Sequence, residues 1–419
     1  MSSQIVTAPG GLFGWWHEAT PGARRALVAA SLGWMLDSFD VMLYSLVLAY
    51  LMADLAMSTT TAGLLGSLAL LASAAGGMMF GVVADRYGRT RALMGSILIY
   101  SVFTGACGLA QSVTQLAVFR VLLGIGMGGE WASGAALVSE TWPAQHRGKA
   151  LGFMQSTWAI GYAAAAAVTA IVLPIWGWRA VFFVGVLPAL FTVWVRRRVE
   201  EPQIWRELRT VQSDERVAAI GDIFRGHLLP LTLAITFMNA CTMFAWWGFN
   251  LWIPAYLSLS PDKGGVGLSA YAMSGLVIAM QVGMWFGYVT FGFIADKIGR
   301  KMTYIVYVTA AAVLILTYTS TRNPLVLLLL GPFVAFFGTG YFSGFGAITA
   351  EIYPTRIRAT AQGFTYNIGR VASAVAPFMV GSLAATHGFQ VALSATAVAF
   401  LLAAVAWFWI PETKGWQLT

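Results

Sequence analysis

Three carboxyl groups lie inside stretches of the sequence that are otherwise apolar: Asp37 and Asp40 in the run 35–44, and Glu130 further along. An ionised carboxylate in the middle of a membrane-spanning helix costs about 2.5 to 3.5 kcal/mol, so its presence there usually marks a function. Burial disfavours the charged form of a carboxyl group, which lets such a group bind and release protons near neutral pH. These three residues are therefore the candidates for proton binding. The sequence leaves open which of them carries the proton, and the alternative is that they are buried ion-pair partners of arginine.

Two arginines, Arg120 and Arg370, also lie inside apolar stretches. Arginine keeps its charge in proteins, and its planar guanidinium binds a carboxylate through two parallel hydrogen bonds. Arg370 lies about 17 Å into its expected helix, at much the same depth as Asp37, and is the first candidate for binding an anion. Arg120 is the second candidate, with helix orientation through Glu130 or the aspartates as its alternative role. Asp37 and Asp40 are three residues apart, so we expect them on one helix face.

Five further polar or aromatic residues are candidates for contacting the same ligand. An amide or hydroxyl group that faces lipid lacks hydrogen-bond partners, so such a group in a span is expected to face a cavity. A tryptophan in a span is more often part of the packing. These candidates are Asn367, Tyr366, Gln281, Asn250 and Trp247.

The composition indicates which elements must position these residues. Hydrophobic residues make up 58% of the 419 and charged residues 10%, and the mean hydropathy is +0.72, which is typical of an integral membrane protein. Each apolar run is long enough to cross a hydrocarbon core of about 30 Å as a helix, and the alternation expected of barrel strands is absent. We therefore expect an all-α integral membrane fold of twelve transmembrane helices. The runs are roughly 26–53, 62–84, 92–112, 116–139, 150–173, 179–197, 227–258, 270–294, 302–320, 324–349, 359–384 and 389–410.

The distribution of positive charge predicts the orientation. Twenty of the 25 Lys and Arg residues fall in the tails and connections on one side, three on the other side, and two inside spans. Positive charge favours the cytoplasmic side, so both termini are expected in the cytoplasm and the protein in the inner membrane. The same distribution explains the net charge of +8 by topology and by attraction to the lipid bilayer, and no nucleic-acid partner is expected.

The sequence contains an internal repeat. The segment 81–89, GVVADRYGR, is matched by 292–300, GFIADKIGR, at a constant offset (300 − 89 = 211), and the offset continues in later matches, of which the last is Gly177 with Gly388. This predicts two pseudo-symmetric six-helix halves. We expect a cytoplasmic N-terminal segment at 1–25, an N-terminal bundle at 26–197, a cytoplasmic linker at 198–226, a C-terminal bundle at 227–410 and a cytoplasmic tail at 411–419.

Charged residues recur at equivalent places in the two halves, where the spans end at the expected cytoplasmic face. Ion pairs among them could hold neighbouring helices together in one of two rocking states. The alternative is that the positive charges only fix the orientation, although this does not explain why the same Gly and Asp recur with them. These gating candidates are Asp85, Arg86, Arg89, Glu140, Arg147, Asp296, Lys297, Arg300, Glu351 and Arg358.

At these motifs the sequence resembles the major facilitator superfamily of secondary transporters. The Gly-x-x-x-Asp-(Arg/Lys)-x-Gly-(Arg/Lys) loop occurs in both halves, and the fourth span begins with RVLLGIG at 120–126, like the signature motifs of that group. The resemblance extends over essentially the whole chain. It implies two six-helix bundles that alternate access to a central site.

Shorter stretches narrow the resemblance to organic acid:proton symporters. The DSFD at 37–40 is similar to a motif of aromatic acid:proton symporters, and GMGGEW at 126–131 with VEEPQIW at 199–205 is similar to the sialate:proton symporter family. Lactate-type members of the second family carry His, Gln and Asp in span 7, where this chain has Met243, Trp246 and Trp247. A larger or aromatic-bearing acid is therefore the expectation.

Together these features predict a proton-coupled symporter that imports a small organic carboxylate (a monocarboxylate, an aromatic acid or a sugar acid) by alternating access. An enzyme is not expected, because the sequence lacks a nucleophile motif, a metal cluster and a cofactor loop. No cofactor is expected. The partners expected are the acid, protons and lipid, and the protein is expected to be monomeric. The alternatives are a proton-independent facilitator or exporter and a transport-like sensor.

Overall fold

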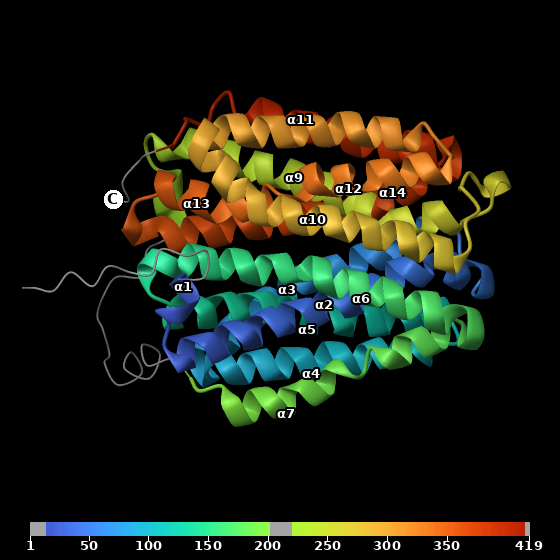
Figure 1. The fold of residues 1–419 in the computed structure, drawn as a ribbon, viewed down its shortest axis with the longest axis horizontal. Coiled ribbons are helices and arrows are strands. Elements are labelled where there is room, and N and C mark those ends of the chain that lie inside the picture. Colours follow the sequence, from blue (N-terminus) through green and yellow to red (C-terminus); the bar gives the residue numbers. More distant parts are fainter. Residues whose placement is uncertain (1–13, 202–219, 415–419) are drawn as a thin grey trace, which may run out of the picture.

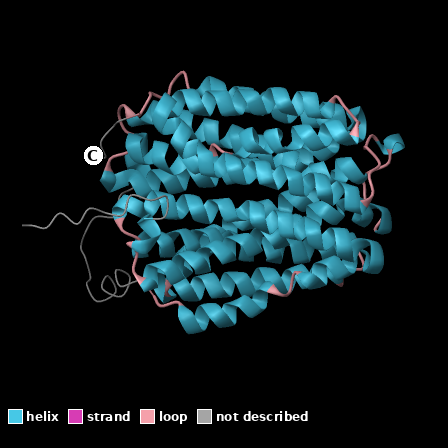
Figure 2. Ribbon diagram, viewed as in Figure 1, coloured by secondary structure: helices cyan, strands magenta, loops and turns pink. Residues whose placement is uncertain are grey.

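The computed structural model describes residues 14–201 and 220–414, and every regular element in these ranges is a helix (Figure 2). Parts of the expected N-terminal segment, linker and tail therefore lie outside the described residues. The elements are α1 (Gly14–His17), α2 (Pro21–Asp54), α3 (Thr59–Tyr87), α4 (Arg89–Gly108), α5 (Val113–Thr141), α6 (Ala144–Val184), α7 (Pro188–Arg198), η1 (Ile220–Phe224), α9 (Leu228–Ser258), η2 (Pro261–Lys263), α10 (Ala270–Ile298), α11 (Arg300–Thr319), α12 (Pro324–Thr339), α13 (Phe342–Ile352) and α14 (Thr355–Ala406).

The long helices run side by side along one axis and form two layers (Figure 1). Helices α2 to α7 make one layer, in which α2 packs against α6 and α5, and helices α9 to α14 make the other, in which α14 packs against α9 and α11. Helix α1 and the last described residues lie at one end of this axis, which we call the terminal end. The other end is called the opposite end. The predicted all-α membrane fold is confirmed.

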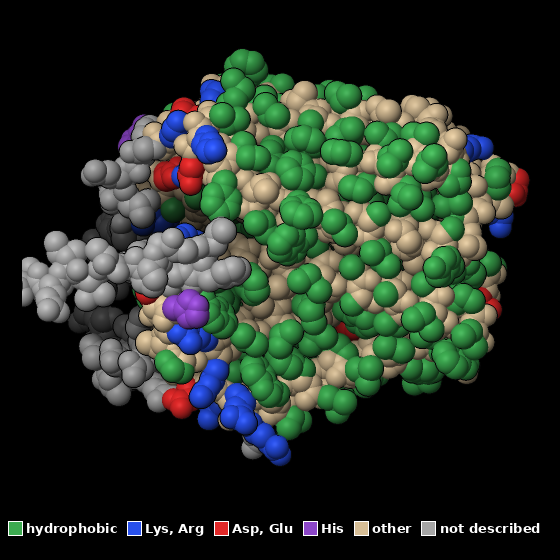
Figure 3. Space-filling view, viewed as in Figure 1, with side chains coloured by type: hydrophobic (Ala, Val, Ile, Leu, Met, Phe, Trp, Pro, Cys, Tyr) green, Lys and Arg blue, Asp and Glu red, His purple; other side chains and the backbone are tan. Residues whose placement is uncertain are grey.

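Polar and apolar side chains are segregated along the same axis (Figure 3). On the face shown, charged side chains gather at the two ends, and hydrophobic side chains cover most of the surface between them. The large apolar residues exposed on the helices include Leu190, Phe293 and Leu329. A surface of this kind is stable in lipid and would aggregate in water.

Two glycines reverse the direction of the chain and bring the number of crossings to twelve. Among the described residues ten helices are long and apolar enough to cross a membrane. Helix α6, at 41 residues, would be about 60 Å long if straight, roughly twice the hydrocarbon core. Gly177 and Gly388 take φ values of +74° and +80°, which only glycine adopts at low cost, and the chain turns back at both.

The internal repeat is visible in the helix boundaries. Helices α4 and α11 begin at Arg89 and Arg300 and end at Gly108 and Thr319, so both ends keep the offset of the sequence repeat. Helices α5 and α12 begin at Val113 and Pro324, which are related by the same offset. The turns at 177 and 388 keep it as well. The two layers are thus two copies of one arrangement of helices.

Serine side chains cap several of the helices. The hydroxyl groups of Ser58, Ser112 and Ser269 accept hydrogen bonds from backbone N–H groups at the starts of α3, α5 and α10. A short side-chain oxygen at this position satisfies a backbone donor that has no partner inside the helix. These caps lie where the chain enters the bundle from the opposite end.

Helices α4 and α11 follow a glycine, and each is capped by a glutamate that lies far away in the sequence. The carboxylate of Glu201 accepts hydrogen bonds from the N–H groups of Thr90 and Arg91, and that of Glu412 accepts them from Arg300 and Lys301. Burial raises the pKa of Glu412, but these N–H groups outweigh it and hold the pKa below its usual value. A negative charge at a helix N-terminus is also favoured by the helix dipole.

The two layers are joined tightly near the opposite end. The hydroxyl group of Ser45 donates to the carbonyl of Leu251 at 2.6 Å, and the backbone N–H of Phe378 donates to the hydroxyl of Ser67 at 3.1 Å. Gly63 lies so close to the other layer that an added Cβ would overlap the carbonyl oxygen of Pro377. The structure is therefore closed between its two halves at the opposite end.

Close helix packing within the first half depends on glycine. A Cβ at Gly161 of α6 would overlap the carbonyl oxygen of Met35 in α2, so these helices touch backbone to backbone. Gly152, earlier in α6, has nothing within 4 Å of its Cβ position. Small residues are typical of such contacts in membranes, where close van der Waals packing drives helix association.

We expect Gly161→Ala to destabilise the protein by about 1 to 3 kcal/mol, because the methyl group forces α2 and α6 apart. Gly152→Ala is the matched control and is expected to be neutral or stabilising by up to about 1 kcal/mol, because alanine favours helix. Thermal unfolding of the two purified variants in the same detergent measures both effects. Equal midpoints for the two variants would contradict the packing described.

Candidate functional site

Three charged side chains converge at the interface between the halves. Asp37 of α2 and Glu130 of α5 are fully buried, and Arg370 of α14 is 7% exposed. Arg370 lies close enough to both carboxyl groups for their charges to interact, and the two carboxyl groups also interact with each other. The carboxyl groups come from one half and the guanidinium from the other.

Small residues give these side chains their room. A Cβ at Gly77 of α3 would lie 3.5 Å from a guanidinium nitrogen of Arg370, an ordinary contact distance, so the arginine of the second half lies against α3 of the first. A Cβ at Gly33 of α2 would lie 2.5 Å from a carboxyl oxygen of Glu130. The ring of Tyr366, one turn before Arg370, has its centroid 6.0 Å from the guanidinium carbon.

The carboxyl oxygens of Asp37 and Glu130 are buried, and none of them has a hydrogen-bond partner among the described atoms. Leaving an ionised carboxylate in that condition costs several kcal/mol, so binding a proton or an arriving cationic group lowers the free energy. Within the described residues, no group of three or more His, Cys, Asp or Glu is arranged to hold a metal ion. The chemistry available here is proton binding beside a fixed positive charge.

Asp40 points to a different neighbourhood from Asp37. Its carboxyl group lies beside Thr104 of α4, and one of its oxygens is 2.9 Å from the Cβ position of Gly185. Its charge still interacts with that of Asp37. Asp40 is therefore inside the first half, whereas Asp37 faces the interface.

Arg120 lies apart from the three converging groups. Its guanidinium carbon is 3.7 Å from the centroid of the Tyr44 ring, and its Nε donates to the carbonyl of Leu65 at 3.4 Å. The hydroxyl group of Tyr44 in turn donates to the carbonyl of Ala62. A guanidinium stacked on a tyrosine ring in this way stabilises the packing of α2, α3 and α5. The sequence offered a pairing of Arg120 with Glu130 or the aspartates as its alternative role. In the structure its guanidinium lies on an aromatic ring instead.

Two of the five polar and aromatic candidates make contacts across the interface between the halves. The side-chain amide of Asn250 points to the sulfur of Met42 at 3.5 Å, and the indole of Trp247 meets that of Trp158 with centroids 6.0 Å apart. Trp158 also packs against Trp34, at 4.6 Å. These contacts bring α9 of the second half against α2 and α6 of the first.

The remaining two amides bond to their own helices. Gln281 donates to the carbonyl of Val277 and keeps a buried amide oxygen without a partner among the described atoms. Asn367 donates to the carbonyl of Gly363 at 2.8 Å. Tyr366, the fifth candidate, lies directly beside Arg370.

The gating candidates form ion pairs within each half at the terminal end. Arg89 pairs with Glu140 at 2.8 Å, which joins α4 to α5. Its counterpart Arg300 pairs with Glu351 at 3.2 Å and also with Asp296. The clusters therefore tie helices of the same half together in this conformation.

The other gating candidates have various surroundings. Arg86 and Lys297 are exposed, and Lys414 donates to the backbone carbonyl of Lys297. Arg358 donates to the carbonyl of Tyr353 at 3.2 Å. The side chains of Asp85 and Arg147 lie outside the part of the chain that the structure describes.

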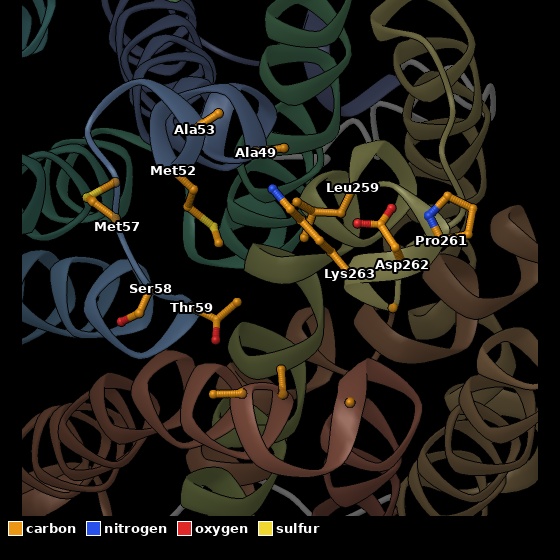
Figure 4. A pocket seen from close by; sticks show the side chains of 14 residues that line it. Ala49, Met52, Ala53, Met57, Ser58, Thr59, Leu259, Pro261, Asp262 and Lys263 are labelled. Atoms are coloured by element: carbon orange, nitrogen blue, oxygen red, sulfur yellow. The ribbon is translucent and has the colours of Figure 1, made fainter.

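A cavity of about 560 Å³ opens between the halves at the opposite end (Figure 4). Figure 4 shows Met52, Ser58 and Thr59 on one side of it and Leu259, Asp262 and Lys263 on the other. Asp37, Glu130 and Arg370 do not line it. The closed contacts of Ser45, Ser67 and their partners lie between this cavity and the three charged groups.

Sequence reasoning missed some residues that support the site. Ser38 donates from its hydroxyl group to the carbonyl of Trp158 at 2.7 Å and so fixes α2 against α6 beside Asp37. Glu201 and Glu412, the distant helix caps, were not among the candidates either. These two glutamates are related by the offset of the internal repeat, and that match was the signal in the sequence that could have found them.

Known transporters resemble this chain along most of its length. The chain is 33% identical to the cis,cis-muconate transport protein of Acinetobacter baylyi, over 86% of this chain and 87% of that one. It is 31% identical to the sialic acid transporter NanX of Escherichia coli, over 95% and 96% of the two chains. The crystal structure of a D-xylose-proton symporter has a TM-score of 0.76 at 22% identity, covering 95% of this chain and all of that one, and it shows the shared fold.

The sequence profile of the Major Facilitator Superfamily matches residues 30–289 and 264–419. The match includes both halves and the site between them. The relatives are transporters, so the prediction of a transporter in place of an enzyme is confirmed. This multi-pass membrane protein belongs to the Major Facilitator Superfamily.

Proposed function

We propose that the protein imports a small organic carboxylate together with protons across the inner membrane, by alternating access between its two halves. The terminal end is assigned to the cytoplasm because most of the lysines and arginines lie on that side. The relatives support an acid as substrate, since they are named for muconate and sialic acid. We propose that the protein acts as a monomer, because one chain supplies both halves of the site.

One observation carries this proposal: a single buried arginine from the second half faces two buried carboxyl groups from the first half. The guanidinium of Arg370 is suited to bind the carboxylate of the substrate through two hydrogen bonds. Asp37 and Glu130 are suited to hold protons, because their oxygens have no other partner among the described residues.

The balance of charge explains how substrate and proton are linked. With both carboxyl groups ionised, the three groups together carry one uncompensated negative charge in a medium of low dielectric constant. A substrate carboxylate on Arg370 adds another negative charge. A proton on either Asp37 or Glu130 removes one negative charge, and protons on both make the loaded site neutral, so protons and anion each favour the binding of the other.

The contacts between the halves at the opposite end support alternating access. Ser45 with Leu251 and Gly63 with Pro377 close the opposite end. Opening that end requires these contacts to break while the halves rock about the central site. A loaded, charge-neutral site favours this motion, because an uncompensated charge need not be carried through the membrane interior.

The experiment that tests the function uses the purified protein in liposomes with an internal pH dye. External benzoate, nicotinate, lactate and sialic acid are added one at a time in the presence of an inward proton gradient. Internal acidification that requires one of the acids, above that of empty liposomes, supports proton symport. Uptake of radiolabelled acid without proton movement would show a facilitator. Internal alkalinisation would show that protons leave the liposome as the acid enters.

For Asp37→Asn we expect loss of substrate-dependent acidification by at least about tenfold, because the amide cannot bind the coupling proton. Exchange of labelled for unlabelled acid across the same liposomes should persist, since exchange needs no net proton movement. The matched control is Asp54→Asn at the end of the same helix, where the carboxylate pairs with Arg179 at the surface. Normal acidification by Asp37→Asn would remove this residue from the coupling mechanism.

For Arg370→Gln we expect the KM for the acid to rise about 10- to 100-fold, because about 1.5 to 3 kcal/mol of charge-assisted hydrogen bonding is lost. Arg370→Lys should lie between wild type and Arg370→Gln, since a lysine keeps the charge and loses the paired geometry. Initial uptake rates over a range of acid concentrations give the KM values. An unchanged KM in Arg370→Gln would place the substrate carboxylate elsewhere.

For Glu140→Gln and its counterpart Glu351→Gln we expect transport rates to change about two- to fivefold, with the Kd of the acid within about twofold of wild type. Partly exposed ion pairs of this kind contribute about 0.2 to 1 kcal/mol, and here they brace helices away from the binding site. Uptake rates and calorimetric Kd values separate the two effects. A large change in Kd with an unchanged rate would exclude the gating role.

A further inference from the structure

We propose that Trp158 and Trp247 form a subsite for the flat, conjugated part of the substrate, next to the arginine that binds its carboxylate. The proposal rests on the proposed function and narrows its substrate to planar, conjugated carboxylic acids. It adds Trp158 to the candidate Trp247, gives both a role in specificity, and assigns a second contact region to the site. Four observations support it.

The first observation is a row of three indoles that crosses the interface. Trp34 of α2 and Trp158 of α6 have ring centroids 4.6 Å apart at an interplanar angle of 49°. Trp158 and Trp247 of α9 have centroids 6.0 Å apart and meet edge to face at 83°. Trp34 and Trp158 belong to the first half, and Trp247 belongs to the second, so the pair of Trp158 and Trp247 must separate or slide when the halves rock.

The second observation is that the row lies within one helical turn of the charged groups on the first half. Trp34 is three residues before Asp37 and lies on the same side of α2. Ser38, next to Asp37, donates its hydroxyl hydrogen bond to the backbone carbonyl of Trp158. An acid whose carboxylate lies near Asp37 therefore has its remaining atoms within reach of Trp158.

The third observation links Trp247 to Arg370 on the second half. The sulfur of Met243 in α9 lies 3.0 Å from the Cβ position of Gly369, the residue that precedes Arg370. Trp247 is four residues after Met243 and so lies on the same face of α9, about 6 Å further along it. Trp247 therefore lies about one helical turn along α9 from the point where that helix packs against the backbone beside Arg370.

The fourth observation is that parts of the three indoles have no partner in the packing among the described residues. Trp247 is only partly buried. The indole N–H of Trp34 is buried and has no hydrogen-bond partner among the described atoms. A buried indole usually finds an acceptor for its N–H group. A hydroxyl, ring nitrogen or second carboxylate on a conjugated substrate would supply one.

Flatness is the property that such a subsite recognises. Conjugated rings and chains present two flat faces and a positive edge, which suit stacked or edge-to-face contact with an indole. A saturated ring of the same size has axial hydrogens on both faces and cannot approach an indole as closely. Two acids of the same charge and similar size should therefore bind with different affinity when only one of them is flat.

The test compares benzoate with cyclohexanecarboxylate, which share a carboxylate on a six-membered carbon ring and differ in flatness. We expect the Kd of benzoate for the purified full-length protein, measured by calorimetry, to be about tenfold lower. In Trp247→Leu the Kd of benzoate should rise toward that of cyclohexanecarboxylate, whereas Trp247→Phe should keep most of the preference. Trp409→Leu, at an exposed tryptophan after α14, is the control for the same substitution elsewhere.

The outcomes distinguish this inference from the function on which it rests. If both acids drive proton uptake in liposomes with equal Kd, or if sialic acid is the only acid carried, the symporter stands and the flat subsite is wrong. The same holds if Trp247→Leu and Trp247→Phe both fold, as monodisperse proteins, and keep the full preference. If no acid binds or moves protons, the proposed function fails and the subsite fails with it.

Discussion

The arrangement of the molecule depends on one electrostatic constraint: where the halves meet inside the bundle, two buried carboxyl groups of the first half lie near one buried arginine of the second. In water these charges would be screened, but in a medium of low dielectric constant every uncompensated charge is costly. Asp37 and Glu130 come from one half and Arg370 from the other, so the balance is made across the surface where the two halves meet. Gly33 leaves the space that a carboxyl oxygen of Glu130 occupies.

The two halves share their helix boundaries but not their charges. At the offset of the repeat, the counterparts of Asp37, Glu130 and Arg370 are Gly248, Tyr341 and Ala159. The scaffold has therefore kept the symmetry of a duplicated unit, with Gly177 and Gly388 turning the chain at the same place in each copy. The polar groups have become different, with the acids in the first copy and the base in the second. The helices of the two halves are therefore symmetric, and the charged groups at their interface are not.

Much of this fold could be predicted from the sequence, because the lengths of the apolar runs and the internal repeat can be read directly from the order of residues. The twelve crossings, the turn at Gly177 and the depth shared by Asp37 and Arg370 follow from counting residues. What counting cannot supply is the direction in which a side chain points and the neighbour it meets. Asp37 and Asp40 share a helix face by spacing, yet one meets Arg370 and the other meets Thr104. Arg120 lies inside a span, as an anion-binding residue would, but its guanidinium lies on the ring of Tyr44, a partner on a different helix that only tertiary packing could reveal.

The helix caps made by Glu201 and Glu412 have a consequence for the independence of the two halves. Each glutamate follows the last helix of its half and closes on the third membrane helix of that same half, not on the other copy. A six-helix unit that ends in such a residue carries its own closure and needs nothing from its twin to complete it. Cleavage of the chain directly after Glu201 would therefore leave each half with the glutamate that caps its own third membrane helix.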